Sequence, residues 1–432
     1  MVGGGLAGCW AAATAAVSGA RVTLVRRTLG ATATSAGPID FVPPAEAADP
    51  GGWLARLGRT DPDHPYVAGG AAAPPLEELE SEAERLGLAL AAAGVPVRVS
   101  LRSPVLLGGI TGQVRLAGVA PESQAAGDLG RAAGRTVAVV GIAGLARFDP
   151  GGVAAALDER RLGWPAPLRA VALMVAPQLP GIPPDVAADL DDATLARAVE
   201  APGGAEALGE AIAAAVRPGT AELALLPAVL GVEDHDSVVQ RVAAAAGLPV
   251  AELVTSPPSA PGWRLQRACD ELCADAGVRV VAGMVSAVRV EEGRAVAVRV
   301  AHLAEELPCD ALVLATGKFL GGGIVADPRP REPLLDLPLF SRGVAVSRLA
   351  LRDLVERARF RDQPFASLGV RTDAAGTPVD EHGRPLYANV TACGDLLTSL
   401  DPTLSGGGLG VVAWTATRAA HTALHSAGSV VA

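Results

Sequence analysis

A glycine cluster at the start of the chain constrains the fold more than any other feature. Glycine occupies positions 3, 4, 5 and 8, a run of small residues follows as far as Gly19, and residues 21–25 then read as a strand. In this G-x-G-x-x-G spacing, Gly3 allows a tight turn, Gly5 lets the backbone approach a phosphate, and Gly8 lets the helix pack on the strand. The helix N-terminus adds free N–H groups and a positive dipole end. The pattern predicts a nucleotide-binding βαβ unit with these three glycines at the cofactor.

Two departures from that pattern affect the expected cofactor. Only two residues precede Gly3, whereas a strand has about five, so we expect that translation starts upstream or that the first strand is missing. The acidic residue that would hold an adenosine ribose after residues 21–25 is replaced by Arg26 and Arg27. Because a basic pair suits a phosphate better than a ribose diol, Arg26 is predicted to bind the cofactor.

Further glycine segments follow later in the chain. An apolar run ends in Ala315-Thr316-Gly317, and another ends in Gly394-Asp395. A glycine-rich loop then opens the last predicted helix, at residues 411–425. The loop over residues 28–70 contains a further Ser-Ala-Gly stretch. The additional candidate cofactor residues are Ser35, Gly37, Gly317, Gly394, Asp395, Gly406, Gly407 and Gly408.

The middle of the chain has a different pattern. A continuous apolar run at 136–142 predicts a buried strand, and residues 150–258 alternate helices with apolar strands. After residue 259 the chain returns to a helix and a hairpin. We therefore expect an α/β fold, namely a two-domain Rossmann-type FAD/NAD(P)-binding flavoprotein. Residues 1–149 and 259–432 would form the flavin domain, and residues 150–258 an inserted α/β cap domain.

Composition excludes several other classes of protein. The net charge is −10 with no evident basic patch, so we expect no nucleic-acid partner. The five scattered cysteines include no Cys-x-x-Cys pair, which argues against a disulfide framework, a zinc site or an iron–sulfur site. His421 and His425 have a metal-ligand spacing, but no third ligand is evident, so we expect no metal. No apolar run reaches the roughly 20 residues of a membrane span.

The order of these motifs resembles the two-domain Rossmann-type flavoproteins, and the likeness implies that Asp395 lies near the flavin ribityl chain. More specifically, the chain resembles the B-type subunit of the anaerobic glycerol-3-phosphate dehydrogenases. The matching stretches are residues 3–8, His64-Pro65-Tyr66, residues 139–145, Leu226-Pro227-Ala228, Arg264-Leu265-Gln266, residues 315–323, Arg331-Glu332-Pro333-Leu334, residues 368–373 and Asp401-Pro402.

This resemblance implies one part of a respiratory enzyme that oxidises sn-glycerol 3-phosphate to dihydroxyacetone phosphate. It implies FMN as the cofactor, with FAD as the alternative. The implied partners are the A-type subunit of the same dehydrogenase and its iron–sulfur, C-type subunit, which passes electrons to quinone. The chain would then be cytoplasmic and peripheral on the inner face of the cell membrane, held there only through its complex.

Three residues are candidates for catalysis. Oxidation of the substrate needs a base for the hydroxyl proton, and the substrate phosphate needs a cation. By their place in the motifs, the candidates are His64, Lys318 and Arg331, each of which could instead be structural, solvated or paired with a carboxylate. Two other functions stay open: a standalone FAD-dependent oxidoreductase of a small substrate, and a non-catalytic structural subunit that has lost flavin.

Overall fold

The computed structural model describes residues 1–158, 168–183, 190–217, 219–257, 259–358, 361–401 and 408–428. The chain divides into two compact units. The first comprises residues 1–32, 40–86 and 269–432, and the second comprises residues 33–39 and 87–268. The second unit therefore begins well before the expected boundary at residue 150, because the strand at 136–142 belongs to its sheet.

A parallel sheet organises the first unit, and the chain start lies within it. β1 (Thr23–Arg26) pairs with β10 (Arg279–Ala282), and β14 (Leu312–Leu314) pairs with β20 (Val390–Ala392). Val2 bridges the two pairs, because it makes parallel bridges to both Val25 and Leu314. Val2 thus occupies the position in the sheet at which the strand before the glycine turn is expected. The glycine turn that follows is held at the carboxyl edge of the sheet.

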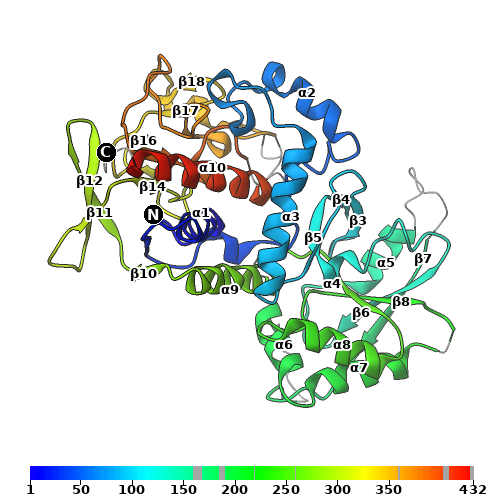
Figure 1. Cartoon of the computed structure of the whole chain (residues 1–432). Helices are drawn as coiled ribbons and strands as arrows, with labels where there is room; N and C mark the ends of the chain where they lie inside the picture. The colour runs from blue at the N-terminus through cyan, green and yellow to red at the C-terminus, as the bar shows by residue number, and fades with distance from the viewer. Residues whose placement is uncertain are drawn as a thin grey trace. The chain divides into compact units, whose positions relative to one another are not determined.

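Helices cover this sheet. α1 (Leu6–Val17) is buried along most of its length; half of its residues are alanine, and it packs beside α10 (Leu409–Gly428), as Figure 1 shows. The small-residue run before Gly19 thus forms a helix that ends two residues before that glycine. α3 (Leu76–Ala92) and α9 (Ala260–Asp275) also belong in part to this unit.

The rest of the first unit is made of short elements. The predicted hairpin forms between β11 (Val285–Glu291) and β12 (Arg294–Val300), where Glu292 and Gly293 both have the positive φ that a tight hairpin turn requires. The remaining elements are α2 (Pro50–Thr60), β13 (Leu307–Pro308), β15 (Val325–Ala326), β16 (Pro330–Arg331), β17 (Leu339–Ser341), β18 (Val344–Ala345) and β19 (Gly369–Val370).

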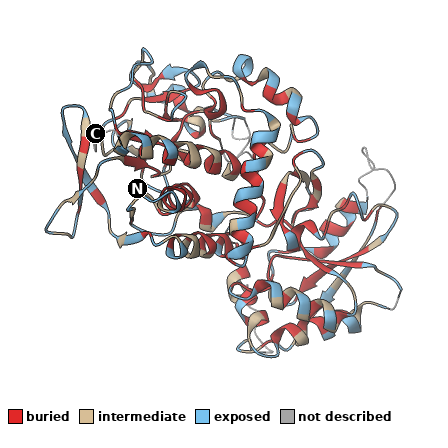
Figure 2. Ribbon diagram, in the orientation of Figure 1, coloured by how far each residue is buried: buried red, intermediate tan, exposed pale blue. Residues whose placement is uncertain are grey.

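The second unit is an α/β domain around a four-stranded parallel sheet in the order β7-β6-β8-β9. The chain runs from β6 (Thr136–Ile142) to β7 (Arg169–Val175) on one side, then crosses to β8 (Leu223–Leu226) and β9 (Val250–Glu252), which is the order of a doubly wound fold. β6 and β8 are buried (Figure 2), as their continuous apolar runs predict. The other elements are α4 (Glu122–Ala125), α5 (Pro150–Asp158), α6 (Asp192–Glu200), α7 (Gly204–Ala215), α8 (His235–Ala246), β2 (Val97–Val99), β3 (Val105–Gly108), β4 (Val114–Ala117) and β5 (Val119–Pro121).

No helix in the described ranges combines the length and apolar character that a bilayer crossing needs. The same ranges contain no group of three or more His, Cys, Asp or Glu side chains that could hold a metal ion.

Candidate functional site

Three glycine segments that are far apart in the sequence meet in the first unit. A Cβ on Gly3, whose φ is +122°, would lie 2.0 Å from the carbonyl oxygen of Ala315. A Cβ on Gly8 would lie 1.8 Å from the carbonyl oxygen of Gly3, and one on Gly394 would lie 2.6 Å from Cβ of Ala7. Only glycine permits these approaches. The turn before α1, the end of β14 and the end of β20 therefore lie together and form one cradle.

A second layer over the glycine turn was not predicted. The backbone N–H of Leu6 donates to Oγ1 of Thr32 at 2.8 Å. Gly30 lies so close that a Cβ on it would be 2.3 Å from Cα of Gly5. Residues 30–32 therefore close over the start of α1. These positions lie in a long Pro- and Gly-rich loop, and no spacing in the sequence singles them out.

Arg26 lies beside the same turn, but its charge is already paired. Its guanidinium forms an ion pair with Asp270 of α9, and the hydrogen bond to that carboxylate raises the pKa of Arg26. Its aliphatic stem packs against Gly4, where a Cβ would lie 2.7 Å from Cδ of Arg26. A phosphate at this turn would share Arg26 with Asp270.

Lys318 and Asp395 form an ion pair next to the cradle. Nζ of Lys318 lies 3.5 Å from Oδ1 of Asp395 and also donates to the carbonyl oxygens of Ala366, at 2.7 Å, and Leu400. Burial lowers the pKa of Lys318 and raises the pKa of Asp395, and the attraction between the two charges opposes both changes. Asp395 follows Gly394 of the cradle, and its contact with a flavin stays a prediction. The ammonium of Lys318 is directed at protein oxygens.

Thr316 gives the most direct evidence for a ligand. Its hydroxyl is buried and has no hydrogen-bond partner in the structure. The residue lies at the edge of the cradle, since its backbone N would be 3.1 Å from a Cβ on Gly3, and its hydroxyl oxygen packs against Gly323. Buried hydroxyls are nearly always hydrogen-bonded, so an unpaired one indicates a partner that the chain does not supply. Together with the helix N-terminus and Asp395, it fits a flavin nucleotide, which carries both phosphate and polyol oxygens.

Other predicted cofactor residues lie elsewhere or outside the described ranges. Ser35 and Gly37 belong to the second unit, where the N–H of Gly37 donates to Oγ of Ser35 at 3.1 Å. Gly37 packs there against Gln124. Gly408 precedes α10, and its carbonyl accepts from the N–H of Val412 at 2.9 Å. Gly406 and Gly407 lie outside the described residues.

His64 takes a structural role. Its Nδ1 accepts from the backbone N–H of Tyr66 at 3.2 Å, and its ring makes edge contacts with Trp53 and Tyr66. Burial, with a smaller effect from the charge of Arg418, lowers the pKa of His64 to about 3. The imidazole is therefore neutral at pH 7 and caps the turn that begins at Pro65.

Arg331 and its neighbour Glu332 have opposite environments. Arg331 is exposed on β16, whereas Glu332 is fully buried and accepts the backbone N–H groups of Leu334, at 3.0 Å, and Leu335, at 2.8 Å. Burial raises the pKa of Glu332. The Arg-Glu-Pro motif is thus a turn held by a buried carboxyl group, with its arginine available to solvent.

A pocket of about 540 Å³ opens in the first unit beside the Lys318 contacts. Ser367, Ser399 and Asp401 line it, and they adjoin the two carbonyl groups that Lys318 binds. Asp61 also faces it, with a pKa that burial raises. The pocket is lined by polar groups and is large enough for a small hydroxylated molecule.

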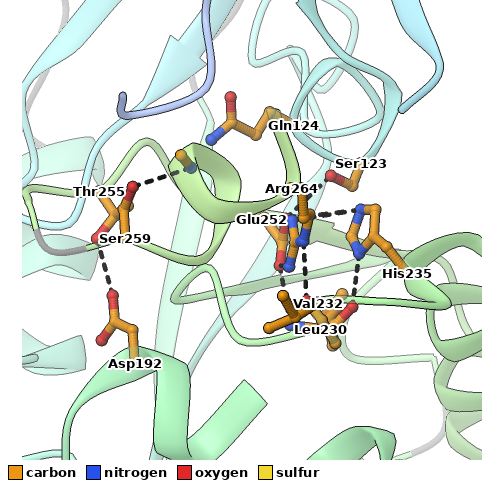
Figure 3. Close-up of polar contacts among 12 residues, drawn as sticks. Ser123, Gln124, Asp192, Leu230, Val232, His235, Glu252, Thr255, Ser259 and Arg264 are labelled. Atoms are coloured by element: carbon orange, nitrogen blue, oxygen red, sulfur yellow. Dashed lines mark hydrogen bonds and ion pairs between the residues drawn. The ribbon is translucent and has the colours of Figure 1, made fainter. Parts of the chain in front are cut away.

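The second unit contains its own buried polar cluster, drawn in Figure 3. Arg264 donates two hydrogen bonds to Glu252, at 2.6 and 2.8 Å, and its Nε donates to the carbonyl oxygen of Gly231 at 2.8 Å. Glu252 also accepts from Oγ of Ser123 and from the N–H of Leu230. Arg264 and Glu252 thus hold the loop after β8 through Leu230 and Gly231. The motif at residues 226–228 begins this loop, so both it and the Arg264 motif contribute to the same local structure.

Comparisons with known proteins show the family to which the chain belongs. The family model described as FAD binding domain matches residues 1–411. The B-type subunit of the anaerobic glycerol-3-phosphate dehydrogenase of Yersinia pestis bv. Antiqua (strain Antiqua) is 30% identical over 426 residues, which covers 95% of this chain and 94% of that protein. The probable B-type subunit of the same kind of enzyme from Halobacterium salinarum (strain ATCC 29341 / DSM 671 / R1) is 34% identical over 215 residues, covering 46% and 47% of the two chains.

A solved structure is similar over nearly the whole length but only loosely. The 3-ketosteroid-delta4-(5alpha)-dehydrogenase of Rhodococcus jostii RHA1 is 14% identical, covers 99% of this chain and 95% of that one, and has a TM-score of 0.37. That score is too low to support an argument about this chain. The family model and the full-length relatives carry the assignment. The chain is a Rossmann-type flavoprotein that belongs to the FAD-binding domain family and, within it, to the family of B-type subunits of the anaerobic glycerol-3-phosphate dehydrogenases.

Proposed function

We propose that this chain is the flavin-bearing, B-type subunit of an anaerobic glycerol-3-phosphate dehydrogenase. In this proposal the enzyme converts sn-glycerol 3-phosphate to dihydroxyacetone phosphate and passes electrons towards quinone. The observation that carries the proposal is the cradle of three glycine segments, with the unpaired hydroxyl of Thr316 beside it. The names of the full-length relatives supply the substrate class.

The choice between FAD and FMN depends on the residues around the glycine turn. FMN follows from the resemblance, and the Arg26-Arg27 pair agrees with it by replacing a ribose-binding acid. Arg26 is, however, ion-paired with Asp270, so its charge gives less support to an FMN phosphate. The family model is that of an FAD binding domain. We therefore propose FAD as the occupant, and FMN stays a prediction that identification of the released flavin decides.

The residues of the cradle would divide the work of holding the cofactor. A bound flavin accepts a hydride equivalent from the substrate carbon. The first-turn N–H groups of α1 that follow Leu6, whose own N–H donates to Thr32, would bind a phosphate group, since a helix N-terminus attracts anions. The carboxylate of Asp395 would accept hydrogen bonds from the ribityl hydroxyls, and the hydroxyl of Thr316 would pair with a further polar atom of the flavin.

Of the three catalytic candidates, Arg331 best fits contact with the substrate. His64 is buried and neutral, and the ammonium of Lys318 is engaged by protein oxygens. The exposed guanidinium of Arg331 could bind a phosphate dianion through two parallel hydrogen bonds. Arg331→Met should then raise KM for sn-glycerol 3-phosphate about tenfold or more with little change in kcat, since a charge-assisted hydrogen bond contributes roughly 1.5–3 kcal/mol. An unchanged KM would remove Arg331 from the substrate site.

We further propose that the chain acts with the A-type and C-type subunits of the same dehydrogenase. The subunit designation of the relatives supports this partnership. The iron–sulfur, C-type subunit would then connect this chain to the inner face of the cell membrane. Co-expression and affinity capture of a tagged chain test the proposal, because both partners should co-purify with it in a fixed ratio.

The first experiment is to purify the full chain, denature it, and identify any released flavin by chromatography. Release of about one FAD per chain supports the proposed site, and FMN would restore the prediction from the resemblance. A chain that stays colourless after both flavins are supplied would favour a non-catalytic, structural role. Substrate-dependent reduction of a quinone by the chain without partners would favour the standalone oxidoreductase.

A further inference from the structure

Lys318 is unusual in the composition of the whole chain. It is the only lysine among 36 Lys and Arg residues, and every other basic side chain of this kind is arginine. It is also buried, with 5% of its side chain exposed. In a chain that otherwise uses arginine throughout, a single lysine in a buried position indicates that arginine does not fit there.

The contacts of Lys318 explain this requirement. Its ammonium faces three oxygen atoms, namely the carbonyls of Ala366 and Leu400 and Oδ1 of Asp395. An ammonium is compact and has three donors, which matches three converging oxygens, whereas a guanidinium is planar, wider and has five donors. All three acceptors lie on segments distant from Lys318 in the sequence. The side chain therefore ties the end of β14 to two loops and to the turn after β20.

The two charges of the pair are exposed to different extents. The side chain of Asp395 is 32% exposed, while that of Lys318 is buried. One carboxylate oxygen thus faces the ammonium, and the carboxylate retains capacity to accept hydrogen bonds from a ligand. The backbone that carries Asp395 is also fixed, because the N–H of Gly394 donates to Oγ1 of Thr415 at 3.0 Å.

We propose that Lys318 is a positioning residue of the flavin site: it fixes the ionised carboxylate of Asp395 at the edge of the cradle so that it can bind a ribityl hydroxyl. This inference rests on the proposed function for the identity of the ligand, but the ion pair itself belongs to the chain. Lys318 acts through Asp395, and its ammonium does not contact the substrate.

Burial makes this role necessary. Burial raises the pKa of Asp395 and so favours the protonated carboxyl group, while the nearby charge of Lys318 opposes that effect. Without the ammonium, Asp395 becomes a weaker acceptor, and the carbonyls of Ala366 and Leu400 lose their donor. Because an arginine cannot meet the three oxygens in the same volume, Lys318→Arg should not rescue the site.

The first test measures flavin affinity of the full-length apo chain by fluorescence quenching. Lys318→Met should weaken flavin binding about 10- to 100-fold, the range expected for a hydrogen bond to a charged group. Asp395→Asn should give a similar loss, and the double variant should lose little more than Asp395→Asn alone. Arg59→Met, which removes an exposed charge from α2, should leave the affinity within about twofold of the original chain.

The second test uses the single lysine and needs no cofactor. With ¹⁵N-lysine incorporated, the chain carries one labelled side-chain ammonium, so one NMR signal reports on Lys318. Asp395→Asn should shift this signal and speed its proton exchange, whereas Asp353→Asn, which removes an exposed carboxylate from a surface turn, should not. This reading also shows whether the variants keep the fold.

The outcomes separate the inference from the proposed function. In one outcome the chain binds no flavin, yet its protected ammonium signal responds to Asp395→Asn. That result would refute flavin binding and overturn the positioning role, because the ion pair would then only stabilise the fold. If the fold-losses of flavin affinity in Lys318→Met and Asp395→Asn multiply in the double variant, or if Lys318→Arg binds flavin with normal affinity, the inference is overturned while the flavin site stands. A double variant that binds flavin about as weakly as Asp395→Asn alone, together with the shifted ammonium signal, supports the inference.

Discussion

Replacing Arg264 by methionine tests how strongly the second unit depends on its buried ion pair. The side chains of Arg264 and Glu252 are 2% and 0% exposed. The substitution removes two charge-assisted hydrogen bonds to Glu252 and one to the carbonyl oxygen of Gly231. It leaves a buried carboxylate with only Oγ of Ser123 and the N–H of Leu230 as donors.

The size of the effect follows from the burial of the pair, because removing one partner of a buried ion pair costs about 3–5 kcal/mol. Burial raises the pKa of Glu252, but the charge of Arg264, together with His235 and hydrogen bonds from Arg264 and the Leu230 N–H, lowers that pKa from 4.5 to about 2. This net lowering corresponds to roughly 3 kcal/mol in favour of the ionised form, after the cost of burial has been met. Since the pKa is lowered on folding, this stability is present above pH 4.5 and is lost as the pH falls towards 2.

Hydrogen exchange at the amide of Leu230 measures the result directly, because this N–H donates to Glu252 at 2.9 Å. Arg264→Met should lower its protection at pH 7 by about two to four orders of magnitude, following from 3–5 kcal/mol. Replacing Glu252 by leucine in the same chain should recover much of that loss, since a buried pair can be exchanged for apolar groups at little cost.

A matched control is the half-exposed ion pair between Arg241 and Glu206, whose Nε and Oε1 are 3.1 Å apart in the same unit and whose side chains are 36% and 47% exposed. Arg241→Met should lower the free energy of unfolding by less than about 1 kcal/mol. Equal effects of Arg264→Met and Arg241→Met would refute the reasoning. So would a double variant at Arg264 and Glu252 that is less stable than Arg264→Met alone.

Three further predictions concern the first unit. Gly8→Ala should abolish flavin retention, because its Cβ would lie 1.8 Å from the carbonyl oxygen of Gly3. The control Gly51→Ala has open space around the new Cβ and should keep the flavin, and flavin absorbance of the purified chains compares the two variants. Protonation of buried His64 should destabilise the first unit as the pH falls from 6.5 towards about 3, since the unfolded chain binds that proton more readily. An NMR titration of His64 with a midpoint near 6.5 would contradict this prediction. Thr316→Val should leave thermal stability of the apo chain unchanged or raised, because the hydroxyl has no partner there, but should weaken flavin binding about tenfold by titration; equal affinity would remove Thr316 from the site.

Secondary structure and the glycine turn were predictable because their causes are local. β6 coincides with the strand predicted at 136–142, α1 forms from the small-residue run before Gly19, and the hairpin predicted after residue 259 forms at 285–300. Helix and strand periods and turn residues depend on neighbouring positions in the sequence. Sequence order and motif content also led to the correct family, which the full-length relatives confirm. These inferences need no knowledge of which segments pair.

The tertiary structure alone decided the features that depend on contacts between residues distant in the sequence. Val2 serves as a strand only because Val25 and Leu314 lie on either side of it. Arg26 is paired with Asp270, 244 residues away, and Lys318 faces oxygens rather than solvent. Residues near one another in the sequence determine backbone preference, whereas the charge state and access of a side chain depend on whatever the fold packs against it.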